Sequence, residues 1–219
     1  MRISIALATF NGEKFLKRQL ASLADQTLKP AELVVSDDGS SDKTLSILFN
    51  FAKTAPFPVN ISQPRSRLGY QRNFIRAAKL CTSELIAFCD QDDIWEPKKL
   101  QIMRREFNDP DVLLAFHGAI LINKAETKIG HVHAPRKNDI RYEPLEFPSG
   151  MIVPGFSQVF RRSLVRFNAL HRLSADPHRP NHRMPHDLWY PFWASVLGRV
   201  VHVPAPLARY RQHGANTSG

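Results

Sequence analysis

Acidic residues are concentrated at two places where an apolar, strand-like run ends. Asp37–Asp38 follow the run at 32–36, and the segment Asp90–Asp93, with three further aspartates, follows the apolar run at 85–89. Carboxylates gathered in this way repel one another unless a cation or hydrogen-bond donors compensate, and Mg²⁺ or Mn²⁺ suits such hard oxygen ligands. A cation held by one or two carboxylates keeps positions open for phosphate oxygens. The pattern therefore predicts a metal-assisted site for a nucleotide diphosphate.

The two acidic segments support this prediction unequally. Asp37–Asp38 precede Gly39–Asp42, which has the composition of a turn and a helix cap, so a structural role for this pair is equally plausible. The acids of Asp90–Asp93 exceed what a helix cap needs. The metal interpretation consequently rests mainly on Asp90–Asp93.

An alternating series of elements must position these acids. From residue 1 to about 122, short β-rich runs alternate with segments of helical period, a pattern typical of an α/β fold whose mostly parallel sheet carries helices on both faces. Strands are expected at 3–8, 32–36, 59–62, 85–89 and 112–122. The buried helical stripes between them are expected at Leu16, Leu20 and Leu23; Leu45, Leu48, Phe49 and Ala52; Phe74, Ala77, Ala78 and Cys81; and Leu100, Met103 and Phe107. Because ligands bind at the carboxyl ends of parallel strands, both acidic segments fall at the edge where a site is expected.

After residue 123 the alternation stops. The polar, proline-bearing stretch 130–150 is expected to be a loop, and 171–185 an irregular surface loop. The stretches 160–170 and 187–197 have a helical period. The chain of 219 residues is 43% apolar, which is enough for one sizeable core, so a single domain is expected over 1–219.

Composition narrows the function classes. The formal charge of +10 attracts nucleic acid, acidic lipid or phosphorylated substrates, but the basic residues are scattered, mostly on the polar sides of helical patterns (Lys98, Lys99 and Arg104 among them), which disfavours nucleic acid. The chain has neither a G-x-G-x-x-G nor a G-x-x-x-x-G-K-[ST] signature, which disfavours a dinucleotide enzyme or a P-loop ATPase. Cys81 and Cys89 are expected to be reduced core residues. No apolar run approaches the roughly 20 residues that span a bilayer, and Met1 leads directly into a strand-like run, so a cytoplasmic protein is expected.

Five short motifs occur in one order along the chain. They are Ala8–Gly12, Val35–Asp42, Leu68–Asn73, Asp90–Trp95 and His186–Asp187. In this order and at these distances they resemble the large family two of inverting GT-A-fold glycosyltransferases, and in particular the rhamnosyltransferase-like branch used in bacterial surface-polysaccharide synthesis. The resemblance spans nearly the whole chain. It implies a nucleotide-sugar and metal half at 1–122 and an acceptor half at 123–219.

The resemblance also implies individual roles. The residues expected at the donor nucleotide or its diphosphate are Thr9, Asn11, Asp37, Asp38, Arg72, Asn73, Asp90 and Arg211. Asp38, with Asp37 beside it, is expected to recognise the pyrimidine or its ribose, whereas a helix-start role is the alternative for Asn73. Asp90 and Asp92 correspond to the metal-binding D-x-D pair for Mg²⁺ or Mn²⁺, and His213 completes the metal or phosphate site. The implied donor is a dTDP- or UDP-sugar.

The resemblance assigns the catalytic base to Asp187, which would accept the proton of the acceptor hydroxyl. A purely structural aspartate at a helix N-terminus is the alternative. The chain has His186–Asp187 where many relatives have a Glu-Asp pair, and Phe116–Gly118 where a serine-aspartate often follows the fifth strand. His186 is the second candidate for the base.

Acceptor and rival functions are less constrained. A saccharide acceptor is expected, and the basic charge favours a lipid-linked one, approached at the inner face of the membrane by peripheral contact. The main rival is a non-catalytic nucleotide-sugar or carbohydrate-binding protein on the same fold, which the intact aspartates disfavour. A nucleotidyltransferase is also disfavoured, because the glycine-rich basic loop expected after its first strand is absent.

Overall fold

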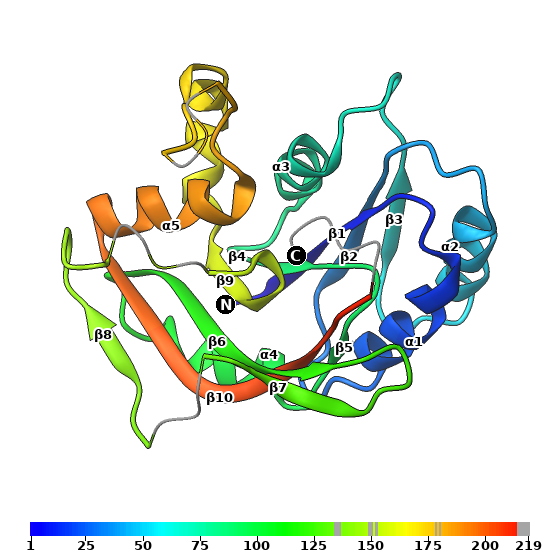
Figure 1. Cartoon of the computed structure of the whole chain (residues 1–219), viewed down its shortest axis with the longest axis horizontal. Helices are drawn as coiled ribbons and strands as arrows, with labels where there is room; N and C mark the ends of the chain where they lie inside the picture. The colour runs from blue at the N-terminus through cyan, green and yellow to red at the C-terminus, as the bar shows by residue number, and fades with distance from the viewer. Residues whose placement is uncertain (134–136, 149–150, 152, 178, 180, 214–219) are drawn as a thin grey trace.

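A ten-stranded sheet with helices on both faces forms the molecule (Figure 1). The computed structural model describes residues 1–133, 137–148, 151, 153–177, 179 and 181–213. The strands are β1 (Ile3–Thr9), β2 (Glu32–Asp37), β3 (Val59–Ser62), β4 (Leu85–Cys89), β5 (Ile94–Trp95), β6 (Val112–Ile122), β7 (Lys128–Val132), β8 (Ile140–Tyr142), β9 (Gln158–Arg161) and β10 (Arg199–Arg211). The helices are α1 (Glu13–Ala24), α2 (Thr44–Ala52), α3 (Tyr70–Leu80), α4 (Lys99–Glu106) and α5 (His186–Leu197), with the 3₁₀ segments η1 (Gly155–Ser157) and η2 (Arg162–Leu173).

The sheet order is β3-β2-β1-β4-β9-β6-β10-β5, with β7 paired to β6 and β8 to β10. The strands β3, β2, β1 and β4 run parallel, as predicted for the first half. β9 is antiparallel to both of its neighbours, β4 and β6, whereas β6 and β10 are parallel. The carboxyl ends of β1, β2 and β4 therefore meet at one edge, which brings the two acidic segments together.

Two hydrophobic clusters lie on opposite faces of the sheet and confirm the predicted α/β class. One is built from α1 and α4, through residues such as Leu16, Leu20 and Met103. The other is built from α3 and α5, through residues such as Phe74 and Trp189. Cys81 and Cys89 are free and buried, as predicted.

Several local predictions are wrong. Phe49, expected in the buried stripe of α2, has 54% of its surface exposed. The stretch 130–150, expected to be a loop, contains β7 and β8, and its residues 134–136 and 149–150 lie outside the described part. The stretch 160–170, expected to be α-helical, begins in β9 and continues as the 3₁₀ segment η2. The long strand β10 has no counterpart among the strands expected from the sequence.

Among the described helices, none is long and apolar enough to cross a membrane.

Candidate active site

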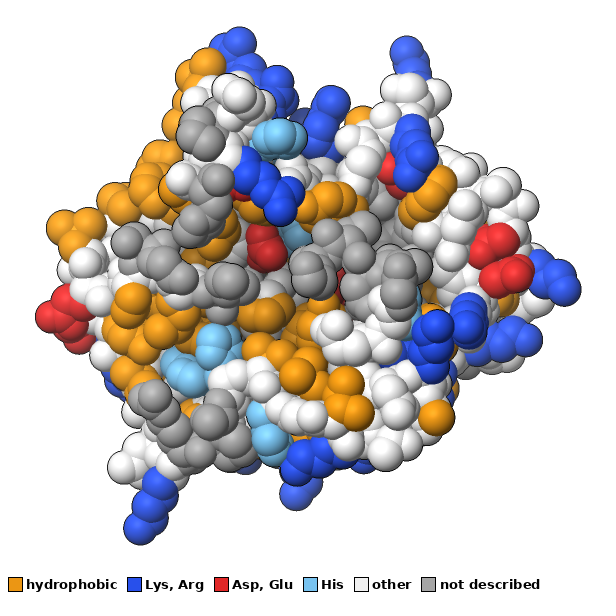
Figure 2. All heavy atoms as spheres, viewed as in Figure 1, with side chains coloured by type: hydrophobic (Ala, Val, Ile, Leu, Met, Phe, Trp, Pro, Cys, Tyr) orange, Lys and Arg blue, Asp and Glu red, His pale blue; other side chains and the backbone are white. Residues whose placement is uncertain are grey.

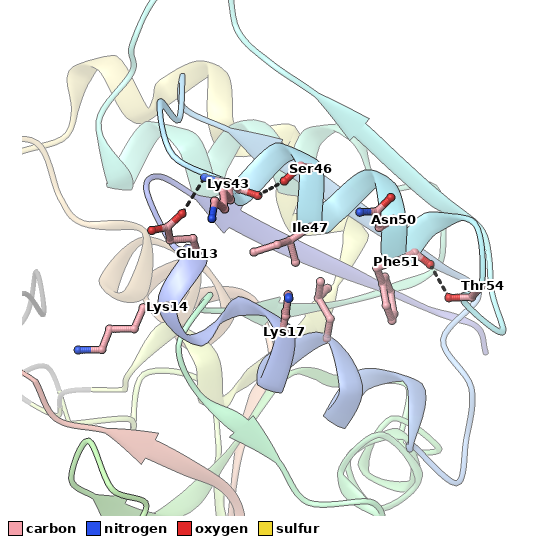
Figure 3. Close-up of a pocket in the computed structure, with 10 residues that line it drawn as sticks. Glu13, Lys14, Lys17, Lys43, Ser46, Ile47, Asn50, Phe51 and Thr54 are labelled. Atoms are coloured by element: carbon pink, nitrogen blue, oxygen red, sulfur yellow. Dashed lines mark hydrogen bonds between the residues drawn. The ribbon is translucent and has the colours of Figure 1, made fainter.

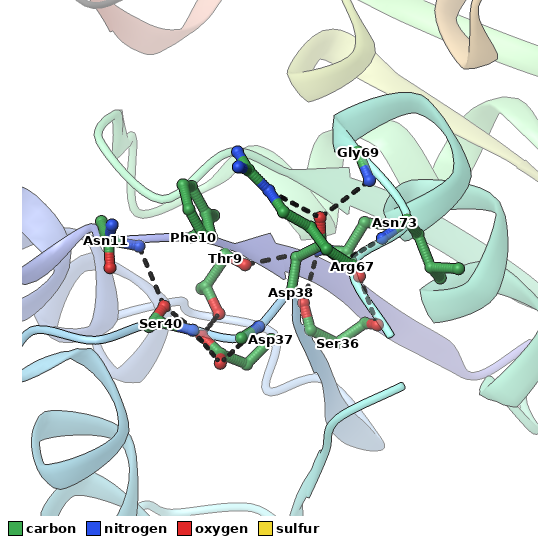
Figure 4. A network of polar contacts seen from close by, with 12 residues as sticks. Thr9, Phe10, Asn11, Ser36, Asp37, Asp38, Ser40, Arg67, Gly69 and Asn73 are labelled. Carbon is green, nitrogen blue, oxygen red and sulfur yellow. Dashed lines mark hydrogen bonds and ion pairs between the residues drawn. The ribbon is translucent and has the colours of Figure 1, made fainter. Parts of the chain in front are cut away.

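Asp37 organises the loops at the ends of β1 and β2 (Figure 4). Its Oδ2 accepts hydrogen bonds from Thr9 Oγ1 at 2.8 Å and from Ser40 Oγ at 2.6 Å. Its Oδ1 accepts from the backbone N–H groups of Gly39 and Ser40 and from Gln63 Nε2. The side chain is fully buried. Asp37 and Thr9, both predicted to contact the nucleotide, are hydrogen-bonded to each other, and their contact with the nucleotide stays a prediction.

Asp38 holds the turn before α3. Its two carboxylate oxygens accept hydrogen bonds from the backbone N–H groups of Leu68 (2.6 Å) and Gly69 (2.8 Å). Gly69 has φ +80°, a conformation that favours glycine, so the turn requires this residue. Arg67 Nε lies 3.9 Å from Asp38 Oδ2, and the guanidinium covers the ring of Phe10 at 3.8 Å (Figure 4). The exposed Arg67 and the Phe10 ring are thus presented beside Asp38, and sequence reasoning identified neither of them.

Asn11 and Asn73 occupy different environments. Asn11 is exposed, with φ 48°, and its Oδ1 accepts the backbone N–H of Ser41 at 2.9 Å. Asn73 is buried in the first turn of α3, where its Oδ1 accepts from Ser36 Oγ at 2.5 Å and its Nδ2 donates to Ser36 O at 2.8 Å. This burial supports the alternative role of Asn73 at the helix start, and its nucleotide contact stays a prediction. Asn11 keeps an accessible side chain.

The acids after β4 form the most unfavourable charge cluster of the site. Burial, followed by the charges of Asp92 and Asp187, raises the pKa of Asp90 to about 8. Burial and the charges of Asp92 and Asp90 raise the pKa of Asp93 well above its usual range, and its Oδ2 has no hydrogen-bond partner among the described residues. These effects place Asp90, Asp92 and Asp93 within electrostatic reach of one another, and Asp187 within reach of Asp90. A bound cation would relieve the excess of negative charge.

Lys99 is a resident cation beside this cluster. The side chain is fully buried, Nζ donates to the Phe156 carbonyl at 2.7 Å, and the ammonium lies 3.3 Å from the centre of the Trp95 ring. Burial lowers the pKa of Lys99 to about 7, whereas the charges of Asp93 and Asp90 act in the opposite direction. The expectation that Lys99 lies on a solvated helix face is wrong: Lys99 begins α4 and points into the protein.

The last described residues close over Asp92. His213 Nε2 lies 2.7 Å from Asp92 Oδ2, and its ring packs 5.0 Å from that of Phe15. Arg211 is only 1% exposed, and its guanidinium donates to Asp92 O at 2.9 Å and pairs with Glu126 at 3.1 Å. Arg211 thus holds the closing strand from within the protein, and its contact with a diphosphate stays a prediction. Asp92 and His213, both predicted to be metal ligands, do come together.

Asp187 stands in the first turn of α5 after Pro185, which has no side-chain cap. Among the described residues nothing donates a hydrogen bond to Asp187 Oδ1, although this atom is buried. Burial is the main cause that raises the pKa of Asp187 to about 6, and the charge of Asp176 adds to it. Hydrogen bonds from the backbone N–H groups of Asp187 and Leu188 act in the opposite direction. The Asp187 carbonyl is fixed by Gln158 Nε2 at 2.9 Å. A carboxylate held in this way is suited to accept a proton near neutral pH.

His186 is a poor candidate for the base. Its ring stacks on Phe74 at 4.1 Å and meets Phe88 edge-on at 5.2 Å. Burial lowers the pKa of His186 to about 3. A Cβ added at Gly155 would lie 2.6 Å from His186 Nε2, so the imidazole is closely packed on that side as well. His186 thus packs as a neutral aromatic residue.

Arg72 lies on the exposed side of α3, and its charge lowers the pKa of His171 in η2. It therefore faces the space between α3 and η2, which agrees with an accessible anion contact. A cavity lies elsewhere, between α1 and α2, and is lined by Glu13, Lys14, Lys17 and Lys43 among others (Figure 3). No acid of the cluster lines it.

Gln91 links the loop after β4 to the loop after β1, and sequence reasoning did not identify it. Its Oε1 accepts the Phe10 backbone N–H at 2.9 Å, and its Nε2 donates to the Phe10 carbonyl at 3.1 Å. A Cβ added at Gly12 would overlap the Gln91 side chain. The only sequence signal is its place inside the D-Q-D-D segment.

The comparison with protein-family models decides the family. Residues 4–167 match the model described as glycosyl transferase family 2. This range includes the loops after β1, β2 and β4 but not α5 or β10. The chain belongs to glycosyl transferase family 2. This assignment confirms the resemblance drawn from the five sequence motifs.

Two curated glycosyltransferases resemble the chain over nearly its whole length, and a third resembles part of it. An uncharacterized glycosyltransferase of Nostoc sp. is 28% identical over 99% of the chain and 66% of its own length. The putative glycosyltransferase EpsH of Bacillus subtilis is 28% identical over 96% of the chain and 61% of its own length. A dTDP-rhamnosyl transferase, RfbG of Shigella flexneri, is 36% identical over 43% of the chain and 34% of its own length. The chain thus spans less than two thirds of the length of the first two relatives.

Solved structures share the fold at low identity. Residues 1–349 of S. aureus TarS, in complex with UDP-GlcNAc, superpose with a TM-score of 0.78 at 18% identity, covering all of this chain and 61% of that one. The mannosyltransferase PcManGT of Pyrobaculum calidifontis, in complex with GDP-Man and Mn²⁺, gives 0.66 at 18% identity, with 100% and 58% coverage. The GT-A fold predicted from the sequence is thereby confirmed.

Proposed function

We propose that this family 2 glycosyltransferase transfers a sugar, with inversion, from a dTDP- or UDP-sugar to an acceptor hydroxyl in cell-surface polysaccharide synthesis. The observation that carries the proposal is Asp187: a buried carboxylate oxygen without a described donor, in electrostatic contact with the acids that follow β4. The dTDP-rhamnosyl transferase relative supports rhamnose as the transferred sugar, and the TarS complex supports UDP as a nucleotide.

The acidic cluster fits a divalent cation. The described residues contain no group of three or more His, Cys, Asp or Glu side chains arranged to hold a metal ion by themselves. Mg²⁺ and Mn²⁺, however, are commonly held by one or two carboxylates together with phosphate oxygens and water. Asp90 and Asp92 would supply those carboxylates; burial and the charges of Asp92 and Asp187 raise the pKa of Asp90, and a cation would stabilise its ionised form. The mannosyltransferase with bound Mn²⁺ has the same fold.

The chain's own residues would then divide the chemistry. When bound, the cation stabilises the negative charge of the departing diphosphate. Asp187 accepts the proton of the acceptor hydroxyl while that oxygen bonds to the anomeric carbon and the bond from that carbon to the diphosphate breaks. His213, at 2.7 Å from Asp92, orients that carboxylate; its direct ligation of the metal stays a prediction. Among the predicted donor contacts, Arg72 and Asn11 have accessible side chains.

The test is a thermal-shift screen of UDP- and dTDP-sugars with Mn²⁺, followed by a transfer assay with the donor that binds. A donor at about 100 times its dissociation constant should stabilise the fold by roughly 2.7 kcal/mol. Asp92→Asn serves as the metal-site control and should abolish the shift that depends on Mn²⁺. Binding without transfer or donor hydrolysis would favour the rival, a non-catalytic nucleotide-sugar-binding protein. A shift that is unchanged by Asp92→Asn would refute the metal assignment.

A further inference from the structure

A basic and aromatic surface next to Asp187 has no role in the proposed chemistry. Between residues 162 and 183 the chain has five arginines and one acid, Asp176. The five, all exposed, are Arg162, Arg166, Arg172, Arg179 and Arg183. Within the described part of the chain none of them forms an ion pair, whereas Asp176 is buried. The positive charge of this segment therefore faces outward without compensation.

Apolar side chains accompany these arginines. Leu173 is 71% exposed and Leu170 44% exposed, both in η2, and Phe192 of α5 is 44% exposed. Figure 1 shows η2 projecting from the body of the molecule above α5, and Figure 2 shows hydrophobic and basic side chains together on that projection. Large exposed apolar side chains on a projecting segment point to a binding surface.

Ring contacts join the two elements into one surface. The Arg166 guanidinium lies 4.7 Å from the centre of the Phe167 ring, and Phe167 stacks on Trp193 at 4.0 Å with an interplanar angle of 7°. Phe192 meets Trp193 edge-on at 5.3 Å. We call Arg166, Phe167, Leu170, Arg172, Leu173, Phe192 and Trp193 the η2–α5 ridge.

The composition of the ridge selects its partner. A segment that lies in a membrane interface typically has half-buried Trp and Phe rings, exposed leucines, and arginines whose charged ends reach the lipid head groups. A second copy of the chain is disfavoured, because a two-fold contact through the ridge would bring the arginines of both copies together. Glu143 and Glu146 limit the surface at the far end of α5, where Leu145 N–H donates to Ser195 O at 2.7 Å.

We infer that the η2–α5 ridge docks the protein on a membrane surface rich in anionic lipid, with the N-terminal end of α5 beside that surface. Phe192 follows Asp187 by five residues in the same helix, which places it about 7.5 Å farther along the axis and about 140° around it. Asp187 therefore lies beside the docked face and not on it, and a lipid-linked saccharide would reach the base from the edge of the ridge. This approach rests on the proposed function, whereas binding of the ridge to the membrane does not.

The test is flotation of the full chain with vesicles of phosphatidylcholine alone and with 30% phosphatidylglycerol, at low salt. Binding to the acidic vesicles and much weaker binding to the neutral ones is expected. Arg166→Gln with Arg172→Gln should weaken binding to acidic vesicles by at least about 20-fold, since each arginine near an anionic surface contributes about fivefold. Lys14→Gln with Lys17→Gln, on α1 at the opposite side of the molecule, removes the same charge and should change binding little (Figure 1).

Equal loss in the two double variants would overturn the inference, because the net charge alone would then explain binding. A dimer seen by light scattering that Phe192→Ser dissociates, with no vesicle binding, would also overturn it. Transfer to a short saccharide acceptor without a lipid separates this inference from the proposed function. The arginine variant should keep that transfer rate, and failure of the unmodified protein in that assay would refute the function whatever the vesicles show.

Discussion

Replacing Asp187 by Asn should stabilise the protein while abolishing turnover. Burial raises the pKa of Asp187 from its ordinary 3.8 to about 6, so the folded state binds the proton more tightly than the unfolded chain. Below about pH 4 both states are protonated and the carboxyl has no effect on the unfolding free energy. As the pH rises from about 4 to about 6 the unfolded chain ionises first, and stability falls. Above about pH 6 the penalty is complete, and the shift of about two units corresponds to about 3 kcal/mol.

The Asn variant removes this penalty. At pH 7.5 its melting temperature should exceed that of the unmodified protein by about 6–12 °C, because 1 kcal/mol moves the midpoint of a domain of this size by about 2–4 °C. Near pH 4 the two proteins should melt together. Turnover should fall by about 100-fold or more, the usual contribution of a general base, with donor affinity hardly changed.

Calorimetric melting from pH 4 to 8 and initial rates over the same range provide the measurement. The rate of the unmodified protein should rise with pH and level off above about 6. Asp176→Asn is the control: removing a charge that raises the pKa of Asp187 should move this limb to lower pH. An Asp187→Asn protein that turns over normally, or that melts lower at pH 7.5, would refute the reasoning, since the amide oxygen of Asn can accept the same backbone N–H groups of Asp187 and Leu188 as the carboxylate does.

Three further changes test the surroundings of the site. Asp92→Asn should abolish metal-dependent donor binding by calorimetry while leaving the melting temperature within a few degrees; unchanged donor affinity would contradict its role. Lys99→Met should raise the unfolding free energy at and below pH 7 in denaturant titrations, because burial lowers the pKa of Lys99 to about 7 and the folded protein therefore disfavours the ammonium; a less stable variant would show that its attraction to the buried acids outweighs this cost. Gln91→Ala should lower the unfolding free energy by about 1–3 kcal/mol, because two hydrogen bonds are lost. Gly12→Ala should destabilise the unmodified protein more than it destabilises the Gln91→Ala variant, in which the overlapping side chain is absent. Strict additivity of these last two substitutions would show that the overlap between a Cβ at position 12 and the Gln91 side chain has no energetic consequence.

The first half of the fold could be predicted because its signals are local. The stripes of α1, α3 and α4 fall at helical spacing, and Leu16, Phe74 and Met103 are buried where the spacing predicts. The strands β1, β2 and β4 are uninterrupted buried runs, as is typical of parallel strands covered on both faces.

The second half could not be predicted because its strands are defined by distant partners. β9 pairs with β4 and β6 through Phe160, opposite Ile86 and Leu114, and nothing in its own four residues specifies that place. β10 contains Pro204 and Pro206, which normally disfavour a strand, and the sheet accommodates them by register shifts on either side of Pro206. β7 and β8 are only partly buried, so their polar sequences resemble loops.

The site shows a similar division between residue type and residue role. The sequence indicates where the aspartates gather, but it does not distinguish those whose oxygens receive donors from those whose oxygens do not. Asp37 and Asp38 follow a strand end just as Asp90 and Asp92 do, yet backbone amides and hydroxyls occupy their oxygens. That distinction depends on loops brought from other strands, such as the turn at Leu68–Gly69.

The hydrogen-bond donors and positive charges around each aspartate distinguish those that hold the loops from those that can bind a cation. The carboxylate oxygens of Asp37 and Asp38 accept hydrogen bonds from donors within the protein. For Asp90, the charge of Lys99 favours the ionised form. This charge does not offset burial and the charges of Asp92 and Asp187, which together raise the pKa of Asp90 to about 8. The excess negative charge of this cluster lowers the free energy of unfolding. A ligand that brings positive charge reverses this effect. The binding of a cation together with a nucleotide diphosphate should therefore release protons from this cluster near neutral pH, and calorimetry in two buffers of different ionisation enthalpy would measure them. If binding proceeds without proton release at pH 7, Asp90 is already ionised and the excess charge is not what selects the cation.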